Sequence, residues 1–199
     1  MHRIALSLAL VTGCGAYMSV GVDTGSKITG GLANPMKQTV TADPRIAAAA
    51  TAAGLETTAT EPTAGRTYTL EVGWRVAMFR IGANLQAHDA DRSTFSLTDT
   101  SSPRYATATA AVDLAWEPVR WKMLSTFLHA GPAMGVLLER TSGGYDTGKG
   151  LRFGAGISAS LSVATVFVDV YRMELAFDSG PAQGMSNISG ATIGIGINR

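Results

Sequence analysis

Features that define several common protein classes are scarce in this 199-residue chain. It holds a single cysteine, Cys14, which cannot build a disulfide framework. Charged residues make up only 16% of the chain, below the roughly 25% of ordinary soluble domains. The net charge of +1 gives no basic surface of the kind that binds nucleic acid. No run of about 18 apolar residues is present, so the sequence offers no transmembrane helix.

Small residues and glycine are plentiful instead. The chain contains 23 glycines, and alanine, serine and threonine are abundant. This composition suits strands with small side chains joined by turns, and it does not suit a helical bundle. The length is that of one domain of ordinary size.

The first sixteen residues have the layout of an export signal. Met1–Arg3 is short and basic, and Ile4–Thr12 is almost unbroken apolar sequence. Four small residues follow at 13–16. An apolar stretch of this length is too short to span a membrane stably, and the order of the three parts is typical of a secretory signal.

The end of this signal resembles the lipobox of bacterial lipoproteins. Val11-Thr12-Gly13-Cys14 places the only cysteine where that motif requires one. In such lipoproteins the cysteine is acylated and becomes the mature N-terminus, so the resemblance implies a signal peptide at 1–13 and lipid attachment at Cys14. The next residue, Gly15, is not the aspartate that marks retention in the inner membrane, which points to the outer membrane. Ordinary cleavage after Ala16, which would discard Cys14, is the alternative.

From Thr67 onward, apolar residues alternate with polar or small ones. Between 68 and 76 every second residue is large and apolar, while threonine, glutamate, glycine and arginine lie between them. A period of two indicates strands with one apolar and one polar face. Only the sixth segment departs from the pattern, and a bulge near Tyr171 would restore a single apolar face. The seven segments lie at 67–76, 79–88, 105–117, 124–139, 151–163, 165–177 and 190–197.

The connections between these strands alternate in length. Three are tight, at 76–78, 117–120 and 163–164, and three are longer and polar, at 89–103, 141–150 and 178–186. This alternation is typical of a transmembrane barrel with short periplasmic turns and longer outer loops.

The order of turns and loops requires one more strand before Thr67. Residues 16–23 alternate in the same way and supply it, which gives an even number of eight. Residues 24–66 then form a long first outer loop. Within it, Ile46–Glu56 predicts an alanine-rich helix, and a loop without fixed structure is the alternative.

Large aromatic residues flank two of the tight turns. Trp74 and Phe79 lie on either side of the first turn, and Trp116 and Trp121 on either side of the second. Indole rings prefer the level of lipid headgroups, so these four residues predict half of an aromatic girdle. The alternative is that they are ordinary core residues beside turns.

On these patterns the chain resembles the family of small eight-stranded outer-membrane β-barrels over residues 15–198. The resemblance implies an all-β fold, a closed antiparallel up-and-down barrel of about eight strands that occupies residues 14–199. It also implies insertion by the outer-membrane assembly machinery. One departure is the end of the chain, Gly196–Arg199, because such barrels commonly end in an aromatic residue that this machinery reads.

The polar faces of the strands carry charges of both signs. In a closed eight-stranded barrel they point into a narrow interior filled by side chains. Isolated buried charge is costly, so a network of ion pairs is expected, with a small pore or a buried active site as alternatives. The residues expected in this interior network are Glu71, Arg75, Arg80, Asp113, Glu139, Arg152, Asp169 and Glu174.

The sequence gives little support to catalysis. His88 and His129 lie on polar faces, whereas lipid-modifying barrel enzymes use a histidine and a serine on the lipid-facing side. Ser125 and His129 share a face but lie about 13 Å apart along a strand, too far for activation of the hydroxyl. No His/Cys cluster has metal-binding spacing. We therefore expect no enzyme, cofactor or metal.

The favoured function is that of an outer-membrane lipoprotein with a structural or interaction role, in contact with membrane lipid and not with nucleic acid. An external partner is not indicated by the sequence. The alternative is a lipid-anchored periplasmic barrel, similar to a lipocalin, that binds an apolar ligand inside. In that case the apolar faces would point inward and the charged faces outward. A lipid-modifying enzyme ranks third.

Overall fold

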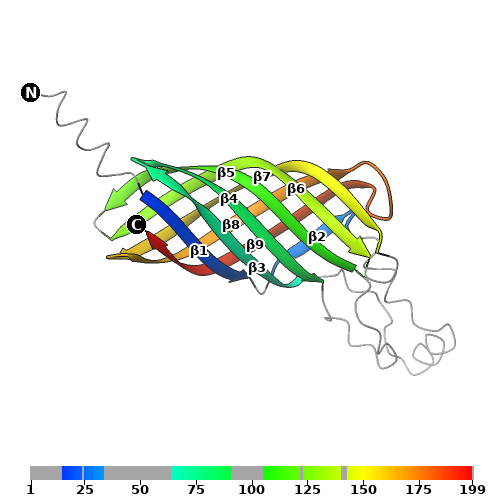
Figure 1. Ribbon diagram of the computed structural model, residues 1–199, viewed down its shortest axis with the longest axis horizontal. Helices are drawn as coiled ribbons and strands as arrows, with labels where there is room; N and C mark the ends of the chain where they lie inside the picture. The colour runs from blue at the N-terminus through cyan, green and yellow to red at the C-terminus, as the bar shows by residue number, and fades with distance from the viewer. Residues whose placement is uncertain are drawn as a thin grey trace, which may run out of the picture.

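The computed structural model describes residues 15–23, 25–33, 64–90, 105–121, 123–139 and 143–198. These residues form a closed barrel of antiparallel strands that is longer than it is wide (Figure 1). Among them, no helix has the length and apolar character needed to cross a membrane. The signal peptide, Cys14 and the helix predicted at 46–56 lie outside the described residues.

The predicted antiparallel eight-stranded barrel is confirmed, with one short strand added. Each wall strand pairs with the next along the chain, and β1 pairs with both β3 and β9, which closes the barrel. The added strand, β2, pairs with β9 beyond the end of β1. The strands are β1 (Gly15–Asp23), β2 (Lys27–Gly30), β3 (Ala64–Val76), β4 (Phe79–Ala90), β5 (Tyr105–Trp121), β6 (Leu124–Glu139), β7 (Tyr145–Leu161), β8 (Ala164–Phe177) and β9 (Gly184–Asn198).

The tight connections lie together at one end of the barrel, which we call the turn end; the opposite end is the loop end (Figure 1). The turns after β3 and β7 consist of two residues, as the sequence predicts. Their first residues, Ala77 and Ser162, have φ of 55° and 58°. Positive φ at this position matches the right-handed twist of the flanking strands, which is why two-residue hairpins use it.

The turn predicted at 117–120 is wrong in position. Strand β5 continues to Trp121, and β6 begins at Leu124. The pairing of the two strands shifts register between Trp116 and Val119. Pro118 lies in this interval, and proline is tolerated in strands at bulges because it has no N–H to donate.

The apolar faces point outward. Leu114, Ile193 and Ile195 are 56–63% exposed, and every wall strand has outward-facing apolar residues. Several charged residues between them, among them Asp113, Arg152 and Asp169, point inward and are buried. This arrangement is the reverse of the one required by a lipocalin-like barrel.

Strand β8 is continuous, so the bulge predicted near Tyr171 is wrong. Its pairing with β7 and β9 shows no shift of register. Val166 and Val170 face outward, while Tyr171 and Phe177 face inward and are buried. Both faces are therefore apolar, because the interior changes from charged to apolar toward the loop end.

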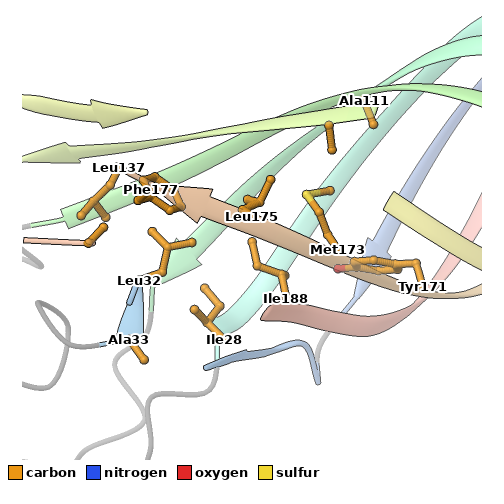
Figure 2. Packing of buried hydrophobic residues seen from close by; sticks show 12 residues of the cluster. Ile28, Leu32, Ala33, Ala111, Leu137, Tyr171, Met173, Leu175, Phe177 and Ile188 are labelled. Carbon is orange, nitrogen blue, oxygen red and sulfur yellow. The ribbon is translucent and has the colours of Figure 1, made fainter. Parts of the chain in front are cut away.

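An apolar cluster fills the interior at the loop end (Figure 2). It includes Leu32 and Ile28 from the segment 27–33, which the sequence analysis assigns to the long first loop. The backbone N–H of Leu32 donates to Ser186 Oγ at 2.9 Å, which fixes the segment against β9. We call 27–33 the inner segment. The cluster comprises Ile28, Leu32, Ala33, Ala111, Ala133, Leu137, Tyr171, Met173, Leu175, Phe177, Ala182 and Ile188.

Candidate functional site

Four buried side chains from neighbouring strands meet in the middle of the barrel; we call them the central ion cluster. They are Asp113 of β5, His129 of β6, Arg152 of β7 and Asp169 of β8. Arg152 Nη1 pairs with Asp113 Oδ2, and its Nη2 lies 2.7 Å from Asp169 Oδ2. Arg152 therefore joins two carboxylates that would otherwise repel each other.

The imidazole of His129 completes this cluster. Its Nε2 donates to Asp169 Oδ1 at 2.9 Å, and Nδ1 accepts from Arg152 Nη1 at 3.0 Å. Both ring nitrogens are thus used within the cluster. Because both partners are themselves buried and charged, the ring has a fixed orientation.

Glycines provide the room for these large inward side chains. Gly154 opposes His129 across β6 and β7, and Gly131 opposes Arg152. Gly82 opposes Asp113 across β4 and β5. A Cβ at Gly154 would collide with the His129 ring, so the alternation of glycine and large polar residues is a packing requirement.

A second group of charges lies at the turn end. Glu117 Oε1 is 2.8 Å from Arg75 Nη2 and 3.1 Å from Arg80 Nε, and its Oε2 is 3.1 Å from Arg120 Nε. The Glu117 side chain is fully buried, whereas the Arg120 side chain is 43% exposed. We call Arg75, Arg80, Glu117 and Arg120 the turn-end arginine cluster.

Tyr17 contacts Glu71 and the turn-end arginine cluster. Its hydroxyl donates to Glu71 Oε1 at 2.6 Å. The guanidinium of Arg80 lies 5.5 Å from the Tyr17 ring centre and 4.5 Å from that of Phe127, within the range of cation–π attraction. Arg80 is therefore held in place by two rings as well as by its ion pair.

A small cavity lies between these two groups of charges. Its lining includes Glu71, Arg75, Arg80, His129 and Arg152. The space for the centres of water molecules is about 30 Å³, enough for one or two waters. This volume does not hold an apolar ligand of lipocalin size.

A separate polar chain crosses the barrel nearer the loop end. Ser26 Oγ and Thr67 Oγ1 are 2.7 Å apart, and Thr67 Oγ1 is 2.8 Å from His88 Nδ1. His88 Nε2 lies 3.3 Å from Thr109 Oγ1. Through Ser26, which directly precedes the inner segment, these hydrogen bonds link that segment to β3, β4 and β5. His88 therefore has a structural role.

The structure brings together most of the charges expected in the interior, but Glu174 is a correction. It lies on the outward face of β8, where it pairs at 2.8 Å with exposed Arg172. The continuous register of β8 causes this, because without a bulge Glu174 falls on the same face as Val170. Glu139 lies at the loop end of β6, far along the barrel from the central ion cluster.

Glu117 is the residue that sequence analysis missed. It was predicted to lie where the strand 105–117 meets the connection 117–120 and was not included in the interior network, whereas the bulge before Val119 keeps it in the wall and buried. The sequence did contain a signal for it: Arg75, Arg80 and Arg120 lie beside tight turns at one end of the barrel. Cations that point inward require a carboxylate partner, and Glu117 is near them in the sequence pattern.

Thr67 Oγ1 is within hydrogen-bond reach of His88 Nδ1, but both side chains are buried inside the barrel wall. The serine and histidine that the sequence analysis considered do not meet. Ser125 Oγ lies 2.7 Å from Ser158 Oγ, and His129 bonds to Asp169 and Arg152 instead. The described residues also contain no group of three or more His, Cys, Asp or Glu side chains placed to hold a metal ion.

No family model and no curated protein sequence matches the chain. Among solved structures it is similar to Neisserial surface protein A, with a TM-score of 0.59 and 10% identity over 93% of this chain and 98% of that one. The likeness is one of fold. The N-terminal β-barrel domain of Pseudomonas aeruginosa OprF matches with a TM-score of 0.48 and 12% identity, over 93% of this chain and 99% of that domain. The attachment invasion locus protein Ail of Yersinia pestis matches with a TM-score of 0.45 and 11% identity, over 94% of this chain and 99% of that one.

Proposed function

We propose that the chain is a β-barrel of the outer membrane of a Gram-negative bacterium, with a structural or interaction role and no catalytic activity. The observation that supports this most directly is the outward apolar surface. Met18, Leu114 and Ile193 are roughly half exposed or more, and similar residues surround the barrel on all eight wall strands. A water-soluble protein rarely exposes so large a contiguous apolar surface, whereas a lipid bilayer requires one.

The aromatic residues at the turn end support the same placement. Trp74 and Trp121 are each 66% exposed, and Phe79 and Trp116 also point outward. Their exposure argues against the alternative that they are core residues. In a membrane these rings would lie at the headgroup level of the periplasmic leaflet.

We further propose that Cys14 is acylated. The first described residue, Gly15, begins β1 at the turn end, beside the exposed indoles. A lipid on the preceding residue would enter the same leaflet that the barrel spans. Its acyl chains would strengthen the attachment of the barrel to the membrane, because each CH₂ group buried in the bilayer contributes about 0.8 kcal/mol of binding free energy.

The interior supports a non-catalytic role. The charges of the central ion cluster are paired with one another, the loop end is filled by the apolar cluster, and the cavity between the two groups of charges is of water size. The functional contacts of such a barrel would be made by its loop end and its outer surface.

Membrane fractionation tests the proposal. We expect the expressed protein to remain in the membrane pellet after washing with sodium carbonate and with urea. We also expect it to migrate differently in gels before and after heating, as closed barrels do. A polypeptide that is folded and monomeric in detergent-free buffer would show that the membrane assignment is wrong.

A further inference from the structure

The turn-end arginine cluster has more cations than its one carboxylate can satisfy. Arg75, Arg80 and Arg120 all make their ion pairs with Glu117. Each guanidinium carries five N–H donors, whereas a carboxylate offers about four acceptor positions. Arg75 Nε is buried and makes no hydrogen bond to any residue that the structure describes, and the contact of Arg80 Nε is the ion pair with Glu117 Oε1 at 3.1 Å. The excess of donors over acceptors favours an additional anion.

The other carboxylates near this cluster are already engaged. Glu71 accepts the hydroxyl of Tyr17, and Asp113 is paired with Arg152. Asp169 bonds to His129 and Arg152. Glu71 keeps its negative charge and lines the same cavity as Arg75 and Arg80. The three arginines at the turn end therefore face two carboxylates, Glu117 and Glu71, and one positive charge is not offset.

The cluster is also preorganised and reachable. The rings of Phe127 and Tyr17 hold Arg80, and Arg120 Nη1 donates to the carbonyl of Ala77 at 3.1 Å. Arg75 and Arg80 line the internal cavity, while Arg120 is partly exposed at the rim. Guanidinium groups fixed in this way lose little freedom when they bind an oxyanion.

We propose that Arg75, Arg80 and Arg120 bind a small oxyanion, a phosphate group, beside Glu117 at the turn end of the barrel. Charge-assisted hydrogen bonds from planar guanidinium groups match the geometry of phosphate oxygens. The phosphate is either a free ion or part of a lipid headgroup. The second source is available because exposed Trp74 and Trp121 surround the same end. The free-ion site depends only on the barrel fold and not on the proposed membrane function.

The first test is a titration of the full chain folded in dodecyl maltoside micelles. Sodium phosphate is compared with sodium chloride at equal ionic strength, and the midpoint of thermal unfolding is read from the heat-modifiable gel mobility. We expect phosphate to raise the midpoint in a saturable way. Arg120→Gln, at a partly exposed position, should weaken phosphate binding by about tenfold. Arg172→Gln is the matched control, because it removes an exposed arginine on the outward face, and it should bind as the unmodified chain does.

The second test removes the competing carboxylate. Glu117→Gln should unfold at a lower temperature than the unmodified chain in chloride, because three arginines lose their partner. Phosphate should restore most of this loss, since the anion would occupy the position of the carboxylate. A cluster that only holds the barrel together would lose stability equally in phosphate and in chloride.

A third test with added lipid distinguishes a free phosphate ion from the phosphate of a lipid headgroup. Short-chain phosphatidylglycerol is added to the same micelles and compared with the corresponding diacylglycerol, which has no phosphate. A shift with the lipid alone assigns the site to a headgroup, and a shift with inorganic phosphate alone assigns it to a soluble ion. The absence of any shift that depends on Arg120, with either probe, would overturn the proposal.

Discussion

Arg152 Nη2 and Asp169 Oδ2 lie 2.7 Å apart inside the barrel, where they join β7 to β8. The same arginine pairs with Asp113 of β5, so one guanidinium connects three strands. Each of these side chains is almost fully buried, and an ion of this kind cannot lose its partner without a large cost in free energy.

Arg152→Met is therefore expected to be severely destabilising. It leaves Asp113 and Asp169 buried with no cation between them, and breaking such a network costs about 3–5 kcal/mol. Urea unfolding of the barrel in lipid vesicles measures the change. Arg172→Met, which removes an exposed pair with Glu174, should cost under about 1 kcal/mol. Equal losses for the two variants would contradict the role assigned to the central ion cluster.

Leu114→Arg tests the direction of the apolar face. Leu114 points outward from the middle of β5. An arginine on the lipid-facing side at the middle of a bilayer lowers the free energy of unfolding of a barrel by about 2–4 kcal/mol. Thr147→Arg, at an exposed position near the loop end of β7, should cost about 1 kcal/mol or less. Unfolding in vesicles compares the two. If Leu114→Arg is tolerated as well as Thr147→Arg, the outward face does not contact hydrocarbon.

Leu32→Ala tests the inner segment. The Leu32 side chain is fully buried among apolar residues, and its truncation should cost about 2–5 kcal/mol, depending on how far the cavity collapses. The loop end should also become more sensitive to added protease. Met185→Ala, at an exposed site on β9, is the control, and it should change the free energy of unfolding by no more than about 0.5 kcal/mol. A similar loss at both sites would mean that the inner segment does not stabilise the barrel.

Cys14→Ser tests the lipid anchor separately from the barrel. Metabolic labelling with a fatty acid should label the unmodified chain and fail to label the variant. The barrel itself should still show heat-modifiable mobility, because Cys14 precedes the first wall strand. Labelling that survives the substitution would exclude acylation at this cysteine.

The alternation of residues was sufficient to predict the wall of the barrel. A period of two specifies which side chains share a face, and the alternation of short and long connections specifies the direction of each strand. The strand at 16–23 was predicted because the order of turns and loops required a strand before Thr67 and because these residues alternate, and β1 lies there, at Gly15–Asp23. These are local properties, which a sequence shows directly.

The parts that were not predicted depend on contacts between distant residues. Glu117 was assigned to a turn because the bulge beside it is recognisable only in the paired strands. Glu174 was assigned to the interior because a change of the interior from charged to apolar along β8 has no local signal. The inner segment was called a loop because its burial comes from packing against β9 and the far wall.

The pairing of β1 with β9 has a consequence for how the molecule is made. Tyr17 opposes Asn198, so the cylinder is sealed by residues from the two extremes of the polypeptide. Until the last hairpin is synthesised, both edges of the growing sheet have unpaired backbone groups and invite aggregation. The barrel can therefore close only after β9 is made, and a translation product that lacks β9 would keep both edges unpaired.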